Sequence, residues 1–376
     1  MRILLLAEGD PETWDSWSGS SRSLVRALRS LGHEVIGGDV TESGWRRWSG
    51  MLRSWAPDRR RWQARYHFGD AGFRRRTAKA RTMLARHAAR TDAVLQIGAT
   101  FDALRHAPTP GYVYCDSNAR LTVRDAPAGE VAALRAEERE ALVTRERAVY
   151  AGAAAVFAMS DYLRRSFVAD FGLPDDKVHT VFAGANLDLE ALPPLRDHRN
   201  GSPTVLFVGK QWERKGGPVL LKAFHGVRRA LPRARLVVAG CAPPVADAPG
   251  VEVVGAVDKN APDGQRRLAA LYQSADVFCM PSRFEPFGVV FVEAMLHGLP
   301  CVGSDRCAIP EIIAQGETGW IVPADDAGAL RDRLIEVLAQ ADALTEMRRR
   351  CRERALAQFT WERVAERIVR RMLVHA

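Results

Sequence analysis

The chain has 376 residues, of which 47% are hydrophobic and 26% charged, a composition typical of globular proteins. Because this length exceeds one ordinary hydrophobic core, we expect two domains. No apolar run approaches the roughly 18 residues of a membrane-spanning helix, and the short run 3–7 is followed at once by Glu8, which favours a buried first strand over a signal peptide. The six cysteines form no CxxC pair and have no histidine at ligand spacing. We therefore expect neither disulfides nor a metal site, and a reducing, cytoplasmic location.

The net charge of +9 is concentrated in one segment. Residues 41–90 hold thirteen arginines and one lysine against three acidic residues, so the segment carries +11 and the rest of the chain −2. Four of the nine tryptophans, at positions 45, 48, 55 and 62, lie in the same segment. Such a pattern favours peripheral contact of Trp45–Arg90 with an anionic membrane or an anionic acceptor, or else a solvated helical face. The same pattern could also meet a nucleic acid, but we expect no nucleic-acid partner.

Short apolar runs alternate with amphipathic stretches in the first half of the chain. This alternation predicts a parallel sheet covered by helices. The expected strands are 2–7, 34–36, 93–97, 111–115, 154–158 and 178–182. The expected helices include 19–31, 71–89 and 128–150.

A polar, turn-rich stretch at 196–203 is typical of a linker, and a second alternating series follows it. Its expected strands are 204–208, 235–239, 251–254, 277–280, 300–302 and 320–322, with helices beginning near 218, 265, 289 and 326. We therefore predict an α/β protein of two doubly wound, Rossmann-like domains. In such sheets ligands bind at the carboxyl ends of the strands, so functional residues should follow the strands directly.

The loop after strand 204–208 contains Gly209, Lys210 and Lys215. Backbone N–H groups of a glycine-containing loop can approach an anion, and two lysines suit a diphosphate. The chain has only six lysines in all, so two within six residues stand out. A solvated loop between strand and helix remains the alternative.

The loop after strand 277–280 contains two glutamates, Glu285 and Glu293, on either side of a predicted helix start. The free N–H groups of Gly288, Val289 and Val290 would point toward an anion. Two carboxylates beside such a pocket suit a polyhydroxyl ligand, because they can accept hydrogen bonds from its hydroxyl groups. A surface glutamate and a helix-capping glutamate are the alternative.

These motifs, with Gly298-Leu299-Pro300 and the run from Pro310 to Val322, resemble the C-terminal domain of glycosyltransferase family 4, over about residues 203–326. The resemblance implies retaining enzymes of the GT-B architecture, with two domains facing a central cleft. It implies that the last helix crosses back onto the N-terminal domain. The expected acceptor-side domain is then 1–197 with 362–376, and the donor-binding domain 198–361.

The resemblance also implies individual roles. Lys215 would hold the donor diphosphate, with Lys210 where most relatives have arginine, and Glu285 would contact the donor sugar. Glu293 would bind the ribose. The backbone of Phe287, Gly288, Val289 and Val290 would face sugar and phosphates, with Gly209 in the phosphate loop and the loop at Gly19 closing over the donor.

One position departs from the family. Many relatives carry a histidine after an N-domain strand, whereas this chain has Asp116 after strand 111–115. Asp116 can accept from a sugar hydroxyl, but it cannot donate as a neutral imidazole does; a helix-capping aspartate is the alternative.

We expect transfer of a sugar from a nucleotide-diphosphate donor to an acceptor hydroxyl. The catalytic residues would be Lys215, Glu285 and Asp116. No Asp-x-Asp motif is present, in keeping with a metal-independent site without cofactors. Two other functions remain open: another GT-B enzyme, such as a sugar-nucleotide epimerase or a phosphorylase, and a basic-surface binding protein with a vestigial donor site.

Overall fold

A computed structural model describes residues 1–376 except 127–128, 196–200, 244–247, 259–260, 341–342 and 375–376. The chain forms two compact units. Unit 1 comprises Met1–Gly184 and Trp361–Ala376, and unit 2 comprises Ala185–Thr360. The chain thus passes between the units at 184/185 and 360/361, whereas the first crossing was expected at 197/198, in a stretch where 196–200 lie outside the described residues.

Unit 1 is built on a six-stranded parallel sheet in the order β2-β1-β3-β4-β5-β6. The strands are β1 (Arg2–Ala7), β2 (Glu34–Asp39), β3 (Ala93–Ile97), β4 (Gly111–Cys115), β5 (Ala155–Ala158) and β6 (Val178–Thr180). Every residue of β3, β4 and β5 is buried, as expected for central strands covered on both faces. Strand order reverses between β1 and β3, so the loops after these strands flank the switch point of this sheet.

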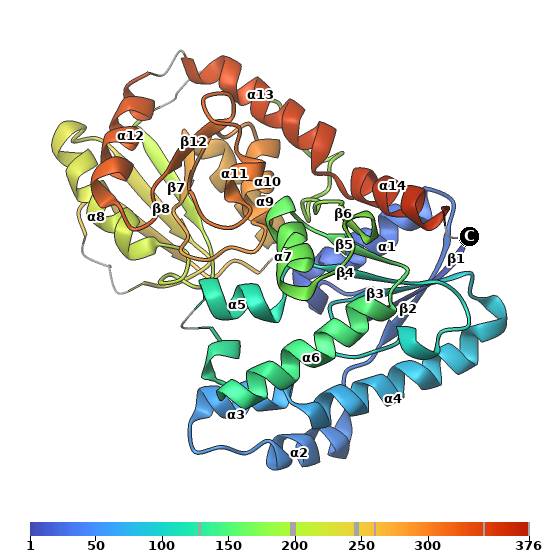
Figure 1. Ribbon diagram of the computed structural model, residues 1–376. Coiled ribbons are helices and arrows are strands. Elements are labelled where there is room, and N and C mark those ends of the chain that lie inside the picture. The colour runs from blue at the N-terminus through green and yellow to red at the C-terminus, as the bar shows by residue number, and fades with distance from the viewer. Residues whose placement is uncertain (127–128, 196–200, 244–247, 259–260, 341–342, 375–376) are drawn as a thin grey trace. The chain divides into compact units, whose positions relative to one another are not determined.

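The helices of unit 1 pack on this sheet and on one another, with α3 on α4 and α2 on α3 (Figure 1). They are α1 (Ser20–Ser30), α2 (Gly44–Arg53), α3 (Arg59–Phe68), α4 (Asp70–His87), α5 (Ala119–Asp125), α6 (Ala136–Gly152), α7 (Asp161–Phe171) and α14 (Trp361–Met372). Short 3₁₀ turns lie at Ser16–Gly19, Ala88–Arg90, Leu104–His106, Val131–Ala133 and Asp175–Lys177. The last helix, α14, packs on α1, and its Met372 carbonyl accepts a hydrogen bond from Tyr112 Oη of β4 at 3.2 Å.

Unit 2 is a second six-stranded parallel sheet, in the order β12-β11-β10-β7-β8-β9. Its strands are β7 (Thr204–Val208), β8 (Arg235–Ala239), β9 (Val251–Gly255), β10 (Val277–Met280), β11 (Cys301–Ser304) and β12 (Gly319–Val322). Its helices are α8 (Gly217–Ala230), α9 (Pro262–Ser274), α10 (Val289–Leu296), α11 (Ile309–Ile312), α12 (Ala327–Ala339) and α13 (Ala343–Gln358). Here the order reverses between β7 and β10, which are adjacent in the sheet.

The predicted α/β class and all twelve predicted strands are confirmed, with bounds that differ by up to three residues. The predicted helix 128–150 begins at a residue outside the described part of the chain, and it is wrong before α6, where a 3₁₀ turn at Val131–Ala133 stands instead. Helices α2, α3, α5, α7, α11 and α13 are not among the helices named from the sequence. All six cysteines are free thiols. Among the described residues, no helix has the length and apolar character needed to cross a membrane.

Candidate functional site

The site in unit 2 begins with the loop that follows β7. The side chain of Lys215 folds back across Gly209, where an added Cβ would lie 2.3 Å from Lys215 Cδ. Gly216 has a φ of +75° and caps α8; a Cβ there would lie 1.9 Å from the Pro281 carbonyl oxygen. Only glycine permits both this backbone conformation and this approach. The two predicted loops therefore meet at the switch point of the sheet.

Lys215 and Glu285 form the ion pair at the centre of the site. Lys215 Nζ lies 2.7 Å from Glu285 Oε2, and each side chain is 12% exposed. The Lys215 ammonium also lies 3.4 Å from Met280 Sδ at the end of β10. A lysine and a glutamate predicted from separate motifs, seventy residues apart, are thus brought into direct contact.

Arg214 adds a second cation that sequence reasoning did not identify. Its Nη1 lies 3.5 Å from Glu285 Oε2 and also donates to the carbonyl oxygen of Phe284. Its own carbonyl accepts from the N–H of Arg283 at 2.9 Å. Two cations against one carboxylate leave a local excess of positive charge, which suits an anionic ligand. Lys210 is exposed on the same loop and has no ion pair among the described residues.

Helix α10 begins beside this pair, since a Cβ added at Gly288 would lie 3.3 Å from Glu285 Cγ. Gly288 caps the helix with a φ of +104°, and the N–H groups of Val289 and Val290 have no acceptor among the described residues. Phe287 is buried under the turn, with its ring 6.2 Å from that of Phe359. Free N–H groups and the helix dipole make such an end favourable for a phosphate.

Glu293 lies one turn into α10 and is 1% exposed. Its Oε2 is 3.2 Å from the Oη of Tyr272, which lies on α9. Burial raises the pKa of Tyr272 well above its usual value, so the phenol keeps its proton and donates to the carboxylate. His297 stacks on Tyr272 at 4.8 Å, and burial lowers the pKa of His297. The ring stack and hydrogen bond fix the direction of the Glu293 carboxylate.

In unit 1 the predicted residue Asp116 contacts the loop that leads to the predicted Gly19. Trp17 Nε1 donates to Asp116 Oδ2 at 3.4 Å, and the Trp17 ring packs edge-on against Tyr114 at 5.4 Å. Trp17, Ser18 and Gly19 have φ values of 48°, 56° and 87°, three successive left-handed residues. For the two non-glycine residues this conformation is unfavourable and is typical of functional loops. The tryptophan contact was not predicted.

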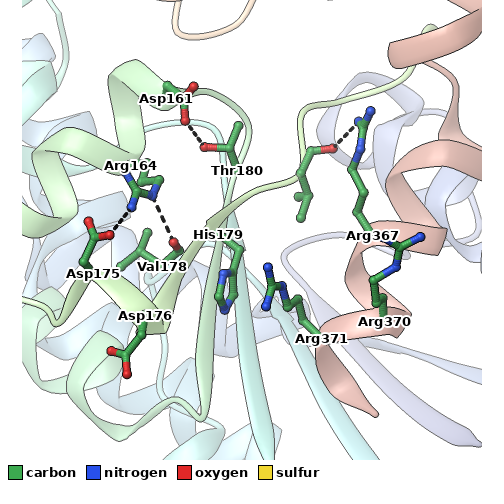
Figure 2. Close-up of a pocket in the computed structure, with 11 residues that line it drawn as sticks. Asp161, Arg164, Asp175, Asp176, Val178, His179, Thr180, Arg367, Arg370 and Arg371 are labelled. Atoms are coloured by element: carbon green, nitrogen blue, oxygen red, sulfur yellow. Dashed lines mark hydrogen bonds and ion pairs between the residues drawn. The ribbon is translucent and has the colours of Figure 1, made fainter. Parts of the chain in front are cut away.

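Two cavities lie away from all these residues. One, of about 570 Å³, lies in unit 1 between α7, β6 and α14 (Figure 2). Arg164 is paired there with Asp175, and Arg367 donates to the Val181 carbonyl. Both charge signs line it, so it offers no clear preference for an anion. The other, about 270 Å³, lies between α2 and α3. No cluster of three or more metal-ligating side chains occurs in the described part of the chain.

Comparisons with known proteins identify similar sequences. Residues 202–340 match the family described as "Glycosyl transferases group 1". The chain is 35% identical over 223 residues to a phosphatidyl-myo-inositol mannosyltransferase of Mycobacterium leprae, covering 57% of each chain. It is 32% identical over 251 residues to an alpha-maltose-1-phosphate synthase of Mycolicibacterium smegmatis, covering 59% of this chain and 63% of that protein. The chain thus spans about three fifths of the length of these relatives.

Solved structures resemble the fold over its whole length. Sucrose-phosphate synthase from Thermosynechococcus elongatus matches with a TM-score of 0.72 and 19% identity, covering 100% of both chains. WaaG, a glycosyltransferase involved in lipopolysaccharide biosynthesis, matches with a TM-score of 0.66 and 15% identity, also covering 100% of both. At these identities the likeness concerns the fold alone, two α/β units as in the GT-B architecture.

Proposed function

We propose that this chain, a GT-B protein whose residues 202–340 belong to the glycosyl transferases group 1 family, moves a sugar from a nucleotide-diphosphate donor to an acceptor hydroxyl with retention of anomeric configuration. The observation that carries the proposal is the Lys215–Glu285 pair, held at 2.7 Å beside the free N-terminus of α10. The lysine and the helix N-terminus suit the diphosphate of such a donor, and the carboxylate suits its sugar.

The donor diphosphate would lie between the N–H groups of Val289 and Val290 and the ammonium of Lys215. Lys215 is already oriented by Glu285, so little side-chain freedom is lost when phosphate binds. Lys210, exposed on the loop, adds charge without a fixed position. The same groups stabilise the charge that develops on the leaving diphosphate, which is where a transferase needs them.

The two glutamates would hold the sugars on either side of the diphosphate. Glu285 is placed to accept from hydroxyls of the donor sugar, and Glu293, directed by Tyr272, to accept from the ribose. In a retaining transfer the acceptor hydroxyl attacks the face that the diphosphate leaves. Its proton then passes to a phosphate oxygen of the leaving group. The protein supplies position and charge rather than a covalent intermediate.

Unit 1 would supply the acceptor side of the reaction. Asp116, held by Trp17, is the proposed hydrogen-bond acceptor for a sugar or acceptor hydroxyl, and the Gly19 loop the segment that closes over the donor. We expect no metal requirement, since lysine and helix end take the role that a divalent cation plays in other transferases. The free thiols favour a reducing, cytoplasmic location. The acceptor is a hydroxyl compound, reached in the cytoplasm or at the inner membrane face through the basic segment Trp45–Arg90.

A thermal-shift panel tests the donor half of the proposal. The purified chain is melted with UDP, GDP, ADP and TDP and with the sugar conjugates of each. One nucleotide series should raise the melting temperature, because a ligand that binds only the folded state stabilises it. The matching sugar nucleotide then serves in acceptor screens, with the anomeric configuration of the product determined by NMR. Absence of any shift across the panel would contradict donor binding, and an inverted product would contradict retention.

A further inference from the structure

The outer face of α2 exposes large apolar side chains. Trp45, Trp48 and Leu52, at helical spacings of three and four, are 76%, 69% and 72% exposed, and Trp55 just beyond the helix is 60% exposed. The other large exposed apolar side chains in the described part of the chain are scattered, at Leu31, Leu356, Leu373 and Val374. We call the four side chains at 45, 48, 52 and 55 the α2 face. Such a concentration marks an interaction surface.

The α2 face points outward because the opposite side of α2 is firmly held. Gly50 packs on the ion pair between Arg75 and Glu42, whose Nε and Oε1 atoms are 2.6 Å apart. Trp62 of α3 turns inward and donates to the Met51 carbonyl at 2.7 Å. Arg65 donates to the Trp55 carbonyl at 2.8 Å. Trp62 thus links α3 to α2, while the other three tryptophans of the segment are exposed to solvent.

The outward tryptophans have a polar end as well as an apolar ring. The indole N–H groups of Trp45, Trp48 and Trp55 donate to no described residue, in contrast to that of Trp62. Rings of this kind are enriched where lipid tails meet headgroups, because the ring leaves water while the N–H still finds a partner. A protein partner would more often provide a pocket for each ring, whereas a bilayer accepts all three rings without a separate pocket for each.

The charges around the α2 face are positive and available. Arg47, Arg53 and Arg59 are exposed and form no ion pair with any described residue. By contrast Arg61 and Arg75, on the inner side, are paired with Glu138 and Glu42. Unpaired arginines beside exposed tryptophans complement an anionic lipid surface.

The cavity between α2 and α3 adds a specific place for a headgroup. It measures about 270 Å³ and is lined by Arg47, Met51, Arg59, Trp62, Gln63, Tyr66 and His67. Arg47 and Met51 lie on the side of α2 next to the α2 face. The lining combines apolar and aromatic side chains with two arginines, which suits a phosphate with an apolar stem.

We propose that α2 lies in the interface of an anionic bilayer, with the α2 face inserted and a lipid phosphate held between Arg47 and Arg59. This inference deepens the proposed function, because it selects a membrane over a dissolved anion as the partner of the basic segment. It does not require the donor site to work. The orientation would bring unit 1 against the membrane surface.

Vesicle co-sedimentation tests the α2 face with the full chain. Vesicles of phosphatidylcholine containing phosphatidylglycerol should bind the protein, and vesicles of phosphatidylcholine alone should bind it much less. Trp45→Ser/Trp48→Ser should lower the partition coefficient at least about tenfold, since two buried rings are lost. The control Leu356→Ser/Leu373→Ser removes two exposed apolar side chains elsewhere and should bind as the wild type does. Circular dichroism and melting temperature establish that each variant is folded.

A second pair of variants tests the headgroup site. Arg47→Gln/Arg59→Gln and the control Arg229→Gln/Arg233→Gln remove the same charge from exposed positions. The first should weaken binding to anionic vesicles at least about fivefold more than the second. Equal losses would overturn the headgroup site and leave only general attraction.

Depth is measured independently, by quenching of tryptophan fluorescence with phosphatidylcholine brominated on its acyl chains, mixed with phosphatidylglycerol. Wild-type emission should be quenched, and the Trp45→Ser/Trp48→Ser variant much less. Binding that is equal for neutral and anionic vesicles, quenching that survives in the variant, or a tryptophan-dependent dimer without vesicle binding would each overturn the proposal. Because none of these assays contains a nucleotide sugar, a failure here leaves the transfer reaction untouched, and the reverse also holds.

Discussion

At the scale of single residues, the sequence predicted some members of the candidate site and missed others. Lys215 and Glu285 were predicted because each stands in a distinctive motif after a buried strand. Arg214 was missed, since one more arginine carries no signal in a chain with 48 of them. Tyr272 was missed for another reason: its contact with Glu293 depends on how α9 packs beside α10, which local pattern does not encode.

Glu146 lets the pH dependence of folding be predicted. It lies buried on α6, accepts from the N–H of Ala119 at 2.9 Å, and burial raises its pKa to about 7. A carboxyl group whose pKa is raised on folding stabilises the protein below its unfolded pKa of about 4.5, and this stability is lost as pH rises through 7. The unfolding free energy of Glu146→Gln relative to that of wild type should therefore be higher at pH 8 than at pH 5. The difference should be up to about 3 kcal/mol.

Urea unfolding of both proteins at the two pH values measures this difference. Glu137→Gln, an exposed position on the same helix, serves as the control and should show no such change between the two pH values. A stability difference for Glu146→Gln that is the same at both pH values would mean that this carboxyl group does not titrate with a raised pKa.

Tyr272→Phe tests whether the hydrogen bond from Tyr272 orients the Glu293 carboxylate. The substitution removes one buried hydrogen bond, which should cost about 1 kcal/mol of unfolding free energy. Because the carboxylate then loses its fixed direction, binding of the preferred nucleoside diphosphate should weaken about threefold to tenfold. Calorimetry measures the affinity, with the ribose-free inorganic pyrophosphate as the comparison ligand. Equal weakening for pyrophosphate would contradict a ribose role.

At the scale of elements, buried strands were the most predictable feature. Strands such as β4 and β10 are short, wholly apolar runs, and no other element of a doubly wound fold has that pattern. Helix α2 escaped prediction because its large apolar residues do not face a core: Trp45 and Trp48 point to solvent. Periodicity identifies helices through the face they bury, so a helix that exposes its apolar face gives a misleading pattern.

Gly216→Ala tests the contact between the two loops of the proposed donor site. Residue 216 has a left-handed backbone conformation, and a methyl group there would lie 1.9 Å from the Pro281 carbonyl oxygen. We therefore expect the unfolding free energy to fall by about 2 kcal/mol or more and nucleotide binding to be lost. Gly316→Ala is the matched control in the same unit: its φ is +76°, but no atom lies within 4 Å of the added Cβ. That variant should lose about 1 kcal/mol and bind normally. Similar behaviour of the two variants would contradict the close approach.

At the scale of the whole molecule, the two units of similar architecture carry different proposed roles. Unit 2 has the strand order of a nucleotide-binding sheet, with its charged residues after the two strands at the switch point. Unit 1 carries Asp116, its supporting Trp17 and the α2 face. Hydrophobic patterning alone was enough to predict the α/β class. The different roles proposed for the two units could be predicted only from the motifs.

Asp116→Asn should separate a role in sugar transfer, proposed for unit 1, from nucleotide binding, proposed for unit 2. Asparagine keeps an oxygen that can accept from Trp17, so the loop should stay in place while the negative charge is lost. We expect transfer to fall about tenfold or more, with the affinity for nucleoside diphosphate unchanged. Single-turnover rates and calorimetry measure the two quantities. Weakened nucleotide binding with normal turnover would reverse the assignment.

The affinity of Lys215→Ala for the nucleoside diphosphate selected by the thermal-shift panel tests the central claim most directly. The matched control is Lys222→Ala, an exposed lysine on α8 in the same unit. We predict binding about tenfold to a hundredfold weaker in Lys215→Ala, since one charge-assisted phosphate contact is lost, and unchanged binding in the control. A folded Lys215→Ala protein that binds the diphosphate as tightly as wild type would contradict the account.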